Sequence, residues 1–362
     1  METKSNLISK TRLINQKIAS TEYKSPSEIV SWMGAMQAQD YSMAKWAIGS
    51  RLKGSTDIKV ESSYNKGEIL RIHLLRPTWH FVSADDIYWM LQLSSTKIKS
   101  SLKSRHAQLE LSDPIIAKTT NIIEKALLKE TYLTREELAK EFSKAAIRTN
   151  ENRLSHILFC AEMDGIICSG PLKINKLTYA LLHERVPHKK ELSKEESLAE
   201  LAKRYFKSRC PATLEDFIWW SNLSVTDARK AVHLIKDDFH SESIGSSVYW
   251  ISNSEDLRIR RNSVHLLPAY DEFLISYRDR SSSLSEVNNK RSVSDNGIFY
   301  PLIVINGQVA GTWKRKTNKN KVSVELLFFK QPAPSTIKLI EDKVNGFGKY
   351  LSKDPELIYR SL

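Results

Sequence analysis

The chain has 362 residues, with 55 lysines and arginines against 42 aspartates and glutamates, for a formal net charge of +13. Its apolar content of 41% and charged content of 27% are ordinary for a globular protein and exclude a disordered one. At this length we expect about two to four domains. The positive charge favours a polyanionic partner, either nucleic acid or an anionic membrane, and a basic protein without such a partner is the alternative.

The N-terminus has no apolar signal segment, and no run approaches the roughly 18 apolar residues that a membrane span needs. We therefore expect a soluble, cytoplasmic protein that does not bind membranes. The cysteines are odd in number and form no C-x-x-C pair. They predict reduced core or surface thiols rather than a disulfide framework or a zinc site, at Cys160, Cys168 and Cys210.

The first predicted helix begins with a capping signal. Ser25 stands at the N-cap, Pro26 at the first helical position and Glu28 where a capping box needs an acidic side chain. A second helix is predicted at residues 43–52. Residues 70–74 alternate between apolar and basic side chains, which predicts a strand with both basic groups on one face.

The same order of helix, turn, helix and strand pair recurs further along the chain. Thr134 and Glu137 form a second capping box. The next helix is predicted at residues 151–163 and ends before Gly165, which suits a left-handed C-cap. Residues 166–182 predict a strand, a turn and a second strand.

A third copy begins with an amphipathic helix at residues 195–207, and Thr213 and Ser224 cap the two helices that follow. The end of the first helix predicts a basic patch of Lys203, Arg204, Lys207 and Arg209. The wing of this copy is expected from two strands and a turn, at residues 248–251, 257–266 and 252–255.

After residue 268 the pattern changes to a β-meander and a final helix at residues 334–351. A polar stretch at residues 281–296 predicts a mobile loop. The strands of the meander are expected at residues 300–305, 308–314 and 321–329, with turns at Asn306-Gly307 and residues 317–320.

These elements predict an α+β, mostly helical protein with three tandem winged-helix units, each a helix-turn-helix with a β-hairpin wing. The expected boundaries are 1–125, 126–192 and 193–268 for the winged helices and 269–362 for the meander and terminal helix. Winged helices also serve as protein–protein scaffolds, but the net charge favours double-stranded DNA as the partner.

Gln37 and Gln39 lie in the predicted turn between the first two helices. On a helix, two residues at this spacing point about 200° apart and cannot share a site. In an extended turn they can point the same way, so a paired role is compatible with their position. A solvent-exposed polar turn is the alternative.

This motif and several further segments resemble the AlkZ/YcaQ-like winged-helix DNA glycosylases. The YcaQ branch carries Q-x-D, whereas Gln39 places this chain with the Q-x-Q branch typified by AlkZ. The resemblance implies three winged helices around a basic concave face and excision of N7-alkylated purines, in some members including interstrand crosslinks. The resembling segments are residues 37–39, 46–51, 75–80, 267–272, 277–280 and 305–313.

The implied chemistry suits glutamine. An amide is a poor base, but an N7-alkylpurine is cationic and leaves as a neutral base without a general acid. The enzyme then needs only to hold a water and stabilise an oxocarbenium-like sugar, which amide oxygens can do. We therefore expect a monomeric, monofunctional DNA glycosylase, without metal or cofactor, in which Gln37 and Gln39 are catalytic.

Two other classes of function compete with this hypothesis. A non-catalytic winged-helix DNA-binding protein or transcription regulator would normally show dimer symmetry and sequence preference. A nuclease is disfavoured, because the sequence shows no carboxylate cluster suited to Mg²⁺.

Several residues could support the glutamines, and each has a structural alternative. Asp40 could be the base or an electrostatic partner, or it could cap the next helix. His80 could touch DNA or the site, or be a packed strand histidine. Asp271, Tyr277 and Arg278 match family positions, and a structural ion pair or loop anchor explains them equally well.

The DNA contacts are expected from basic and aromatic side chains on the predicted strands, helices and turns. Trp79 could act as a wedge between bases or belong to the core. The charged turn that starts at Lys314 could be a solvated face or could grip phosphates. The candidates are Arg71, Arg76, Trp79, Arg229, Lys230, Lys314, Arg315 and Lys316.

Overall fold

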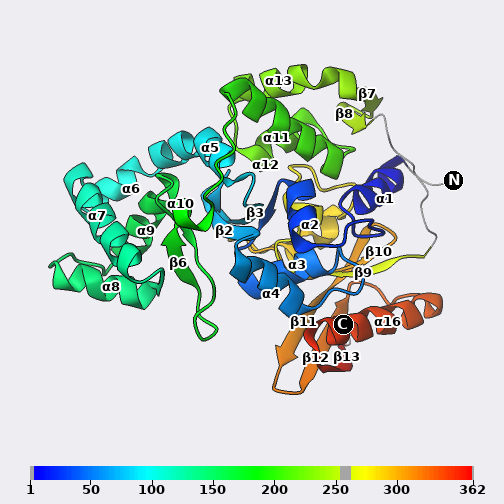
Figure 1. Ribbon diagram of the computed structural model, residues 1–362. Coiled ribbons are helices and arrows are strands. Elements are labelled where there is room, and N and C mark those ends of the chain that lie inside the picture. The colour runs from blue at the N-terminus through cyan, green and yellow to red at the C-terminus, as the bar shows by residue number, and fades with distance from the viewer. Residues whose placement is uncertain (1–3, 253–261, 361–362) are drawn as a thin grey trace. The chain divides into compact units, whose positions relative to one another are not determined.

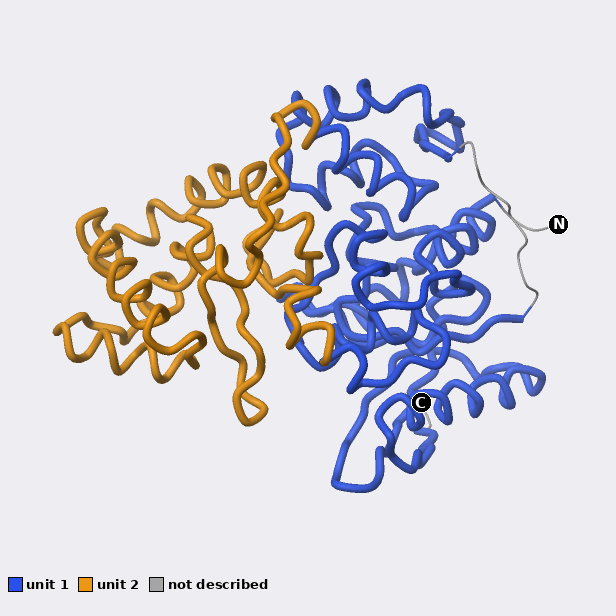
Figure 2. Tube along the Cα trace, viewed as in Figure 1, with its two compact units in different colours: residues 1–61, 198–362 blue, residues 62–197 orange. Residues whose placement is uncertain are grey.

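The computed structural model describes residues 4–252 and 262–360 (Figure 1). Contacts divide the chain into two compact units, unit 1 with residues 1–61 and 198–362 and unit 2 with residues 62–197 (Figure 2). The boundaries fall within helices α4 (Asp57–Lys66) and α11 (Lys194–Arg209). The fold is α+β and mostly helical, as the sequence predicts. In the described part of the chain, no helix is long and apolar enough to cross a membrane.

Unit 1 begins with the elements that carry the glutamine motif. The capping box predicted at residue 25 is confirmed, since Ser25 and Glu28 exchange side-chain and backbone hydrogen bonds. The helix predicted at residues 43–52 starts and ends earlier than expected. In order, the elements are α1 (Lys4–Asn15), α2 (Pro26–Met33), β1 (Ala35–Gln37) and α3 (Tyr41–Gly49).

Helices α12 and α13 also begin where the caps predict, since the hydroxyls of Thr213 and Ser224 accept the expected backbone hydrogen bonds. The predicted wing is wrong. Strand β8 pairs antiparallel with β7, and β9 pairs with β10. Strand β7 is polar and largely exposed, so its sequence lacks the alternation of apolar and polar residues that predicts a strand. These elements are α12 (Leu214–Ser221), α13 (Val225–Leu234), the 3₁₀ helix η1 (Lys236–Asp238), β7 (Phe239–Ile244), β8 (Ser247–Ser252) and β9 (Val264–Leu267).

Two further predictions concern the third copy. The predicted turn at residues 253–255 and the strand residues 257–261 lie outside the described residues. The basic patch at the end of α11 is also a wrong prediction, because Arg209 is fully buried. Lys203 pairs with Asp238 and Arg204 with Glu200, at 2.9 and 2.7 Å.

The C-terminal meander and helix are confirmed. The turn from β10 to β11 has Asn306 and Gly307 at φ 52° and 83°, a left-handed pair that suits Asn-Gly. The sheet order is β13-β12-β11-β10-β9, with β13 parallel to β12. Strand β13 was not predicted, whereas β9 overlaps the strand predicted at residues 257–266 and differs only in its partner. The elements are β10 (Leu302–Ile305), β11 (Gln308–Thr317), β12 (Lys321–Phe328), α16 (Pro334–Leu351) and β13 (Asp354–Arg360).

The segment predicted as a mobile loop, residues 281–296, instead contains helix α15 (Glu286–Ser292). It follows the short helix α14 (Glu272–Ile275). Only one face of α15 is partly covered, so its sequence is mostly polar and lacks the apolar periodicity that predicts a helix. The prediction failed since a surface helix can be nearly all polar when tertiary contacts hold it.

An aromatic cluster joins α3 to the sheet and to α16. The ring of Phe347 contacts Trp46 and Trp313, with centroid distances of 4.9 and 5.1 Å. Each indole N–H donates to a carbonyl of β9, Trp46 to Leu266 at 2.8 Å and Trp313 to Leu267 at 2.7 Å. These contacts fix α3, the helix that follows the glutamine motif, against a buried sheet.

Unit 2 contains the β2–β3 hairpin and a helical layer with a small antiparallel sheet in the order β4-β6-β5. The Thr134–Glu137 capping box and the left-handed Gly165, at φ 70°, are confirmed. All three cysteines of the chain are buried, and none of them forms a disulfide bond. The elements are β2 (Ile69–Leu74), β3 (Thr78–Ser83), α5 (Ile87–Ser101), α6 (Lys103–Gln108), α7 (Asp113–Lys129), β4 (Tyr132–Thr134), α8 (Arg135–Lys144), α9 (Arg153–Met163), β5 (Ile167–Ser169), β6 (Thr178–Leu181) and α10 (Leu182–Arg185).

Candidate functional site

The glutamine motif lies on a short extended segment between α2 and α3. Helix α2 ends at Gly34, whose φ of 71° lies in the left-handed region that favours glycine. The chain then becomes extended through β1, as the sequence analysis expects for this turn. The strand ends at Gln37 and Gln39 follows in a bend, so the strand alternation that would place both side chains on one face does not reach Gln39.

A buried ion pair holds this segment in place. Arg209 on α11 donates to the carbonyls of Met33 and Ala35 at 2.7 and 2.9 Å. The same guanidinium pairs with Glu272 on α14 at 2.8 Å. Glu272 in turn accepts the backbone N–H of Gln37 at 2.7 Å. Carbonyls and an N–H along β1 are therefore fixed by one Arg–Glu pair.

The surroundings of Glu272 keep it ionised. Its other oxygen accepts from Trp220 Nε1 at 3.1 Å and from the Ser276 hydroxyl at 2.5 Å. Burial raises the pKa of Glu272, but the charge of Arg209 and these hydrogen bonds outweigh it and lower the pKa to about 2. The anchor of β1 is thus a permanent negative charge at neutral pH.

This pKa predicts a loss of stability in acid. Because folding lowers the pKa of Glu272 from 4.5 to about 2, its contribution is fully present above pH 4.5 and is lost as pH falls toward 2. We expect the free energy of unfolding, measured in urea between pH 7 and 3, to decline more steeply for the wild type than for Glu272→Gln. Glu286→Gln, at an exposed position of α15, is the control. Parallel pH profiles for wild type and Glu272→Gln would contradict the assignment.

The two glutamines differ in exposure. Gln37 is 6% exposed, whereas Gln39 is an exposed residue. Asp40 is the N-cap of α3 and accepts the backbone N–H of Met43 at 3.0 Å, which is the structural alternative considered for it. Arg315 of β11 donates to the Ser42 hydroxyl at 2.6 Å, so the basic hairpin contacts the first turn of α3.

Two of the supporting candidates in unit 1 lie in the core. Asp271 forms a two-pronged ion pair with Arg51, both N···O distances being 2.9 Å, and caps α14. Tyr277 donates its hydroxyl to the carbonyl of Arg209 at 2.8 Å, and burial raises its pKa. The side chain of Arg278 is exposed, while its backbone N–H donates to Asp216 at 2.8 Å.

The candidates of unit 2 gather on the β2–β3 hairpin. The guanidinium of Arg71 lies 4.0 Å from the centroid of the Trp79 ring, and the ring of His73 lies 3.9 Å from it. The expectation that both basic groups of β2 share one face is therefore confirmed. His80 is fully buried, with Nδ1 2.9 Å from the carbonyl of Thr78. Arg76, in the turn of this hairpin, is partly exposed.

The remaining DNA-binding candidates are mostly at the surface of unit 1. Arg229 and Lys230 are exposed on α13, and Lys314 and Lys316 are exposed on β11. Arg315 is half-buried, because successive residues of a strand point to opposite faces. The structure thus separates the three basic residues of this hairpin into an exposed pair and one that contacts α3.

Sequence reasoning missed the residues that anchor the motif. Arg209 had a detectable signal, since it follows Tyr205 by one helical turn on the apolar face of α11. Glu272 lies within a segment that resembles the family, but no signal in its sequence neighbourhood indicates a role for it. Among the described residues, no group of three or more His, Cys, Asp or Glu could hold a metal ion.

Comparison with known proteins identifies the family. The model of the AlkZ-like DNA glycosylase family matches residues 30–350. An interstrand DNA cross-link repair glycosylase of Streptomyces sahachiroi is 22% identical over 318 residues, which cover 84% of this chain and 85% of that protein. The solved structure of the Streptomyces sahachiroi DNA glycosylase AlkZ shares the fold, with a TM-score of 0.81 at 19% identity over 99% of this chain and 100% of that one. The chain therefore belongs to the AlkZ-like DNA glycosylase family.

Proposed function

We propose that this chain is a monofunctional DNA glycosylase that hydrolyses the N-glycosidic bond of N7-alkylated purines in double-stranded DNA. The observation that carries the proposal is the buried Arg209–Glu272 pair, which fixes the extended segment of the Q-x-Q motif. Preorganised dipoles stabilise developing charge best when their support is rigid. The name of the Streptomyces sahachiroi relative extends the proposal to interstrand crosslinks.

In this mechanism the amide oxygens of Gln37 and Gln39 orient a water and face the positive sugar. The cationic base departs as a neutral molecule, so no general acid is required. The chain needs no strong base because the oxocarbenium-like sugar reacts readily with water. An undamaged base would leave as an anion, and the amides offer it little help. Selectivity for cationic lesions follows from this difference.

We also propose that the fold contains three tandem winged-helix units around a basic concave face, with the boundaries stated above. In unit 2 the order α7-β4-α8-α9-β5-β6 supports one of them. In unit 1 the order α11-α12-α13-β7-β8, with a bridge between Ala212 and Trp250, supports another. Arg229 and Lys230 lie on the second helix of that helix-turn-helix, the position that enters a DNA groove in such motifs.

The proposal is tested by incubating the protein with duplex DNA that contains N7-methylguanine, followed by cleavage at abasic sites. We expect abasic sites to form with the wild type, and the same yield in the presence of EDTA. A Gln37→Ala, Gln39→Ala double variant is the control for contaminating activity. Binding of the duplex without excision would favour the alternative, a non-catalytic DNA-binding protein.

The exposed pair Lys314 and Lys316 predicts a salt effect. If both contact phosphates, changing both to glutamine should reduce the slope of log affinity against log salt by about two units. Arg315→Gln should change the slope less, because its guanidinium is engaged with Ser42. The measurement is fluorescence anisotropy of a labelled duplex over a range of salt concentrations.

A charge-matched control for this measurement is available in the same unit. Lys330 and Lys338 are exposed, and changing both to glutamine removes the same charge elsewhere. An equal loss of slope in both double variants would show that only net charge matters. An unchanged slope for the Lys314→Gln, Lys316→Gln variant would show that the β11–β12 hairpin does not contact DNA phosphates.

A further inference from the structure

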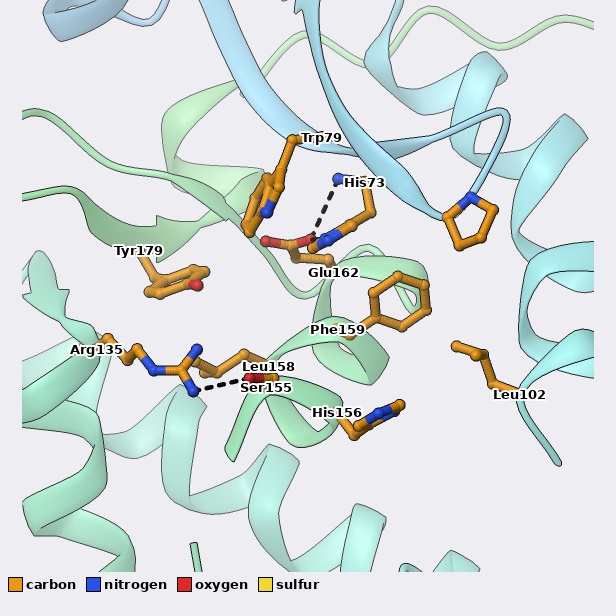
Figure 3. A pocket seen from close by; sticks show the side chains of 11 residues that line it. His73, Trp79, Leu102, Arg135, Ser155, His156, Leu158, Phe159, Glu162 and Tyr179 are labelled. Atoms are coloured by element: carbon orange, nitrogen blue, oxygen red, sulfur yellow. Dashed lines mark hydrogen bonds and ion pairs between the residues drawn. The ribbon is translucent and has the colours of Figure 1, made fainter. Parts of the chain in front are cut away.

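A cavity lies wholly within unit 2 and has no part in the mechanism above. Its volume is about 260 Å³, below the range of roughly 300–1,000 Å³ that drug-sized ligands occupy. It therefore suits a small ring system (Figure 3). Its walls combine aromatic rings, a guanidinium and a buried carboxylate, namely Trp79, Phe159, Tyr179, Arg135 and Glu162.

Glu162 has an oxygen to which the described residues offer no hydrogen bond. The residue is fully buried on α9. Its Oε2 accepts from His73 Nδ1 at 2.5 Å and from the His73 backbone N–H at 3.3 Å. Its Oε1 is equally inaccessible and has no hydrogen-bond partner among the described residues. Buried carboxylate oxygens nearly always carry hydrogen bonds, so this one marks a place for a donor from a ligand.

The aromatic walls around Glu162 are held in fixed orientations. Trp79 is contacted by the ring of His73 and by the guanidinium of Arg71. The ring of Phe159 contacts His73 with a centroid distance of 4.6 Å. Figure 3 shows the Glu162 carboxylate in the space that Trp79 and Tyr179 border. Aromatic faces next to a hydrogen-bonding edge are how proteins hold an unstacked nucleobase.

A neighbouring cavity of about 410 Å³ shares Trp79, Arg135 and Tyr179 with the first. Its lining adds Arg71, Lys176 and Glu136, the last lying 3.9 Å from Lys176, so with Arg135 the cavity has an excess of positive charge. The planar guanidinium group matches phosphate oxygens well. The first cavity therefore contains a carboxylate oxygen without a hydrogen-bond partner among the described residues, and the second contains positively charged side chains. Trp79 and Tyr179 line both cavities.

We propose that the two cavities together bind one guanine nucleotide, with its base in the first and its phosphate in the second. Guanine presents two adjacent N–H donors on its pairing edge, which a carboxylate oxygen can accept. Adenine offers an amino group beside a ring acceptor, which would face the carboxylate unfavourably. The nucleotide is an unpaired residue of a DNA strand. This inference does not depend on the glycosylase reaction, because its test measures binding without excision.

The test is isothermal titration of the full chain with deoxyguanosine monophosphate. We expect saturable binding that Glu162→Gln weakens by about tenfold or more, because the amide turns a donor toward the base where the carboxylate had an acceptor. Deoxyinosine monophosphate, which lacks the amino group, and deoxyadenosine monophosphate should bind more weakly. Glu141→Gln on α8 is the matched control and should leave the affinity unchanged.

A second variant keeps the test decisive if Glu162→Gln does not fold. Lys176→Met should weaken binding of the nucleotide and leave deoxyguanosine binding unaffected, because Lys176 lines only the second cavity. A thymidine oligonucleotide with one guanine should bind more tightly than free nucleotide, and the reverse order would overturn the assignment to a DNA strand. No saturable binding, equal affinities for guanine and adenine nucleotides, or equal losses of nucleotide and nucleoside in Lys176→Met would overturn the proposal.

Discussion

Replacing Gln37 or Gln39 with alanine is expected to lower single-turnover excision of N7-methylguanine by about 10²–10³ each, the loss typical of one preorganised polar contact. Duplex affinity should change little, because most of it comes from phosphate contacts elsewhere. Matched binding curves therefore separate a catalytic effect from weakened binding.

The structure makes these substitutions clean. The segment is anchored through the backbone N–H of Gln37 and the carbonyls of Met33 and Ala35. Truncating either side chain thus removes an amide while the anchoring contacts remain. Gln108→Ala, at an exposed position of α6, is a control for the chemistry of the substitution itself.

Two further variants identify the roles more closely. Gln39→Asp should keep substantial activity, since an anion can also hold water and stabilise a positive sugar. Asp40→Asn should matter less than either glutamine change, because the asparagine oxygen can still cap α3. Full activity in the Gln37→Ala, Gln39→Ala double variant would show that the motif is a polar turn without a catalytic role. Loss of all activity in Asp40→Asn alone would show that Asp40, rather than the glutamines, acts as the catalytic base.

Arg209→Met is expected to lower the free energy of unfolding by about 3–5 kcal/mol, because it leaves the buried charge of Glu272 without its partner. Excision should fall as well, since the carbonyls of Met33 and Ala35 lose their donor. Urea denaturation at neutral pH measures the first effect, and single-turnover excision at a temperature where the variant is folded measures the second.

The control is Lys203→Met on the same helix, whose exposed pair with Asp238 should contribute less than about 1 kcal/mol. The double variant Arg209→Met, Glu272→Gln should recover part of the stability, because it removes the uncompensated charge. Recovered stability without recovered excision would agree with a role in positioning β1. Wild-type excision in a folded Arg209→Met variant would contradict that role.

The sequence alone determined the elements whose signals are local. The capping boxes at Ser25, Thr134 and Thr213 depend on side chains that bond within the same helical turn, so the helices begin as predicted. The Asn306-Gly307 turn and the helix α16 follow from local pattern in the same way. The family itself was also predictable, because its motifs are spread along most of the chain.

Only the tertiary structure decided which strands pair and which charges are buried. Strand β9 pairs with β10 rather than with β8, and β13 joins the sheet in parallel, choices that depend on partners far away in sequence. The sequence predicts that Arg209 is a surface charge, because the residues around it do not reveal Glu272, the carboxylate 63 residues away that neutralises it. A buried ion pair forms only when the fold brings both members out of water together, and although the position of Arg209 on α11 indicates burial, nothing near it in the sequence indicates its partner.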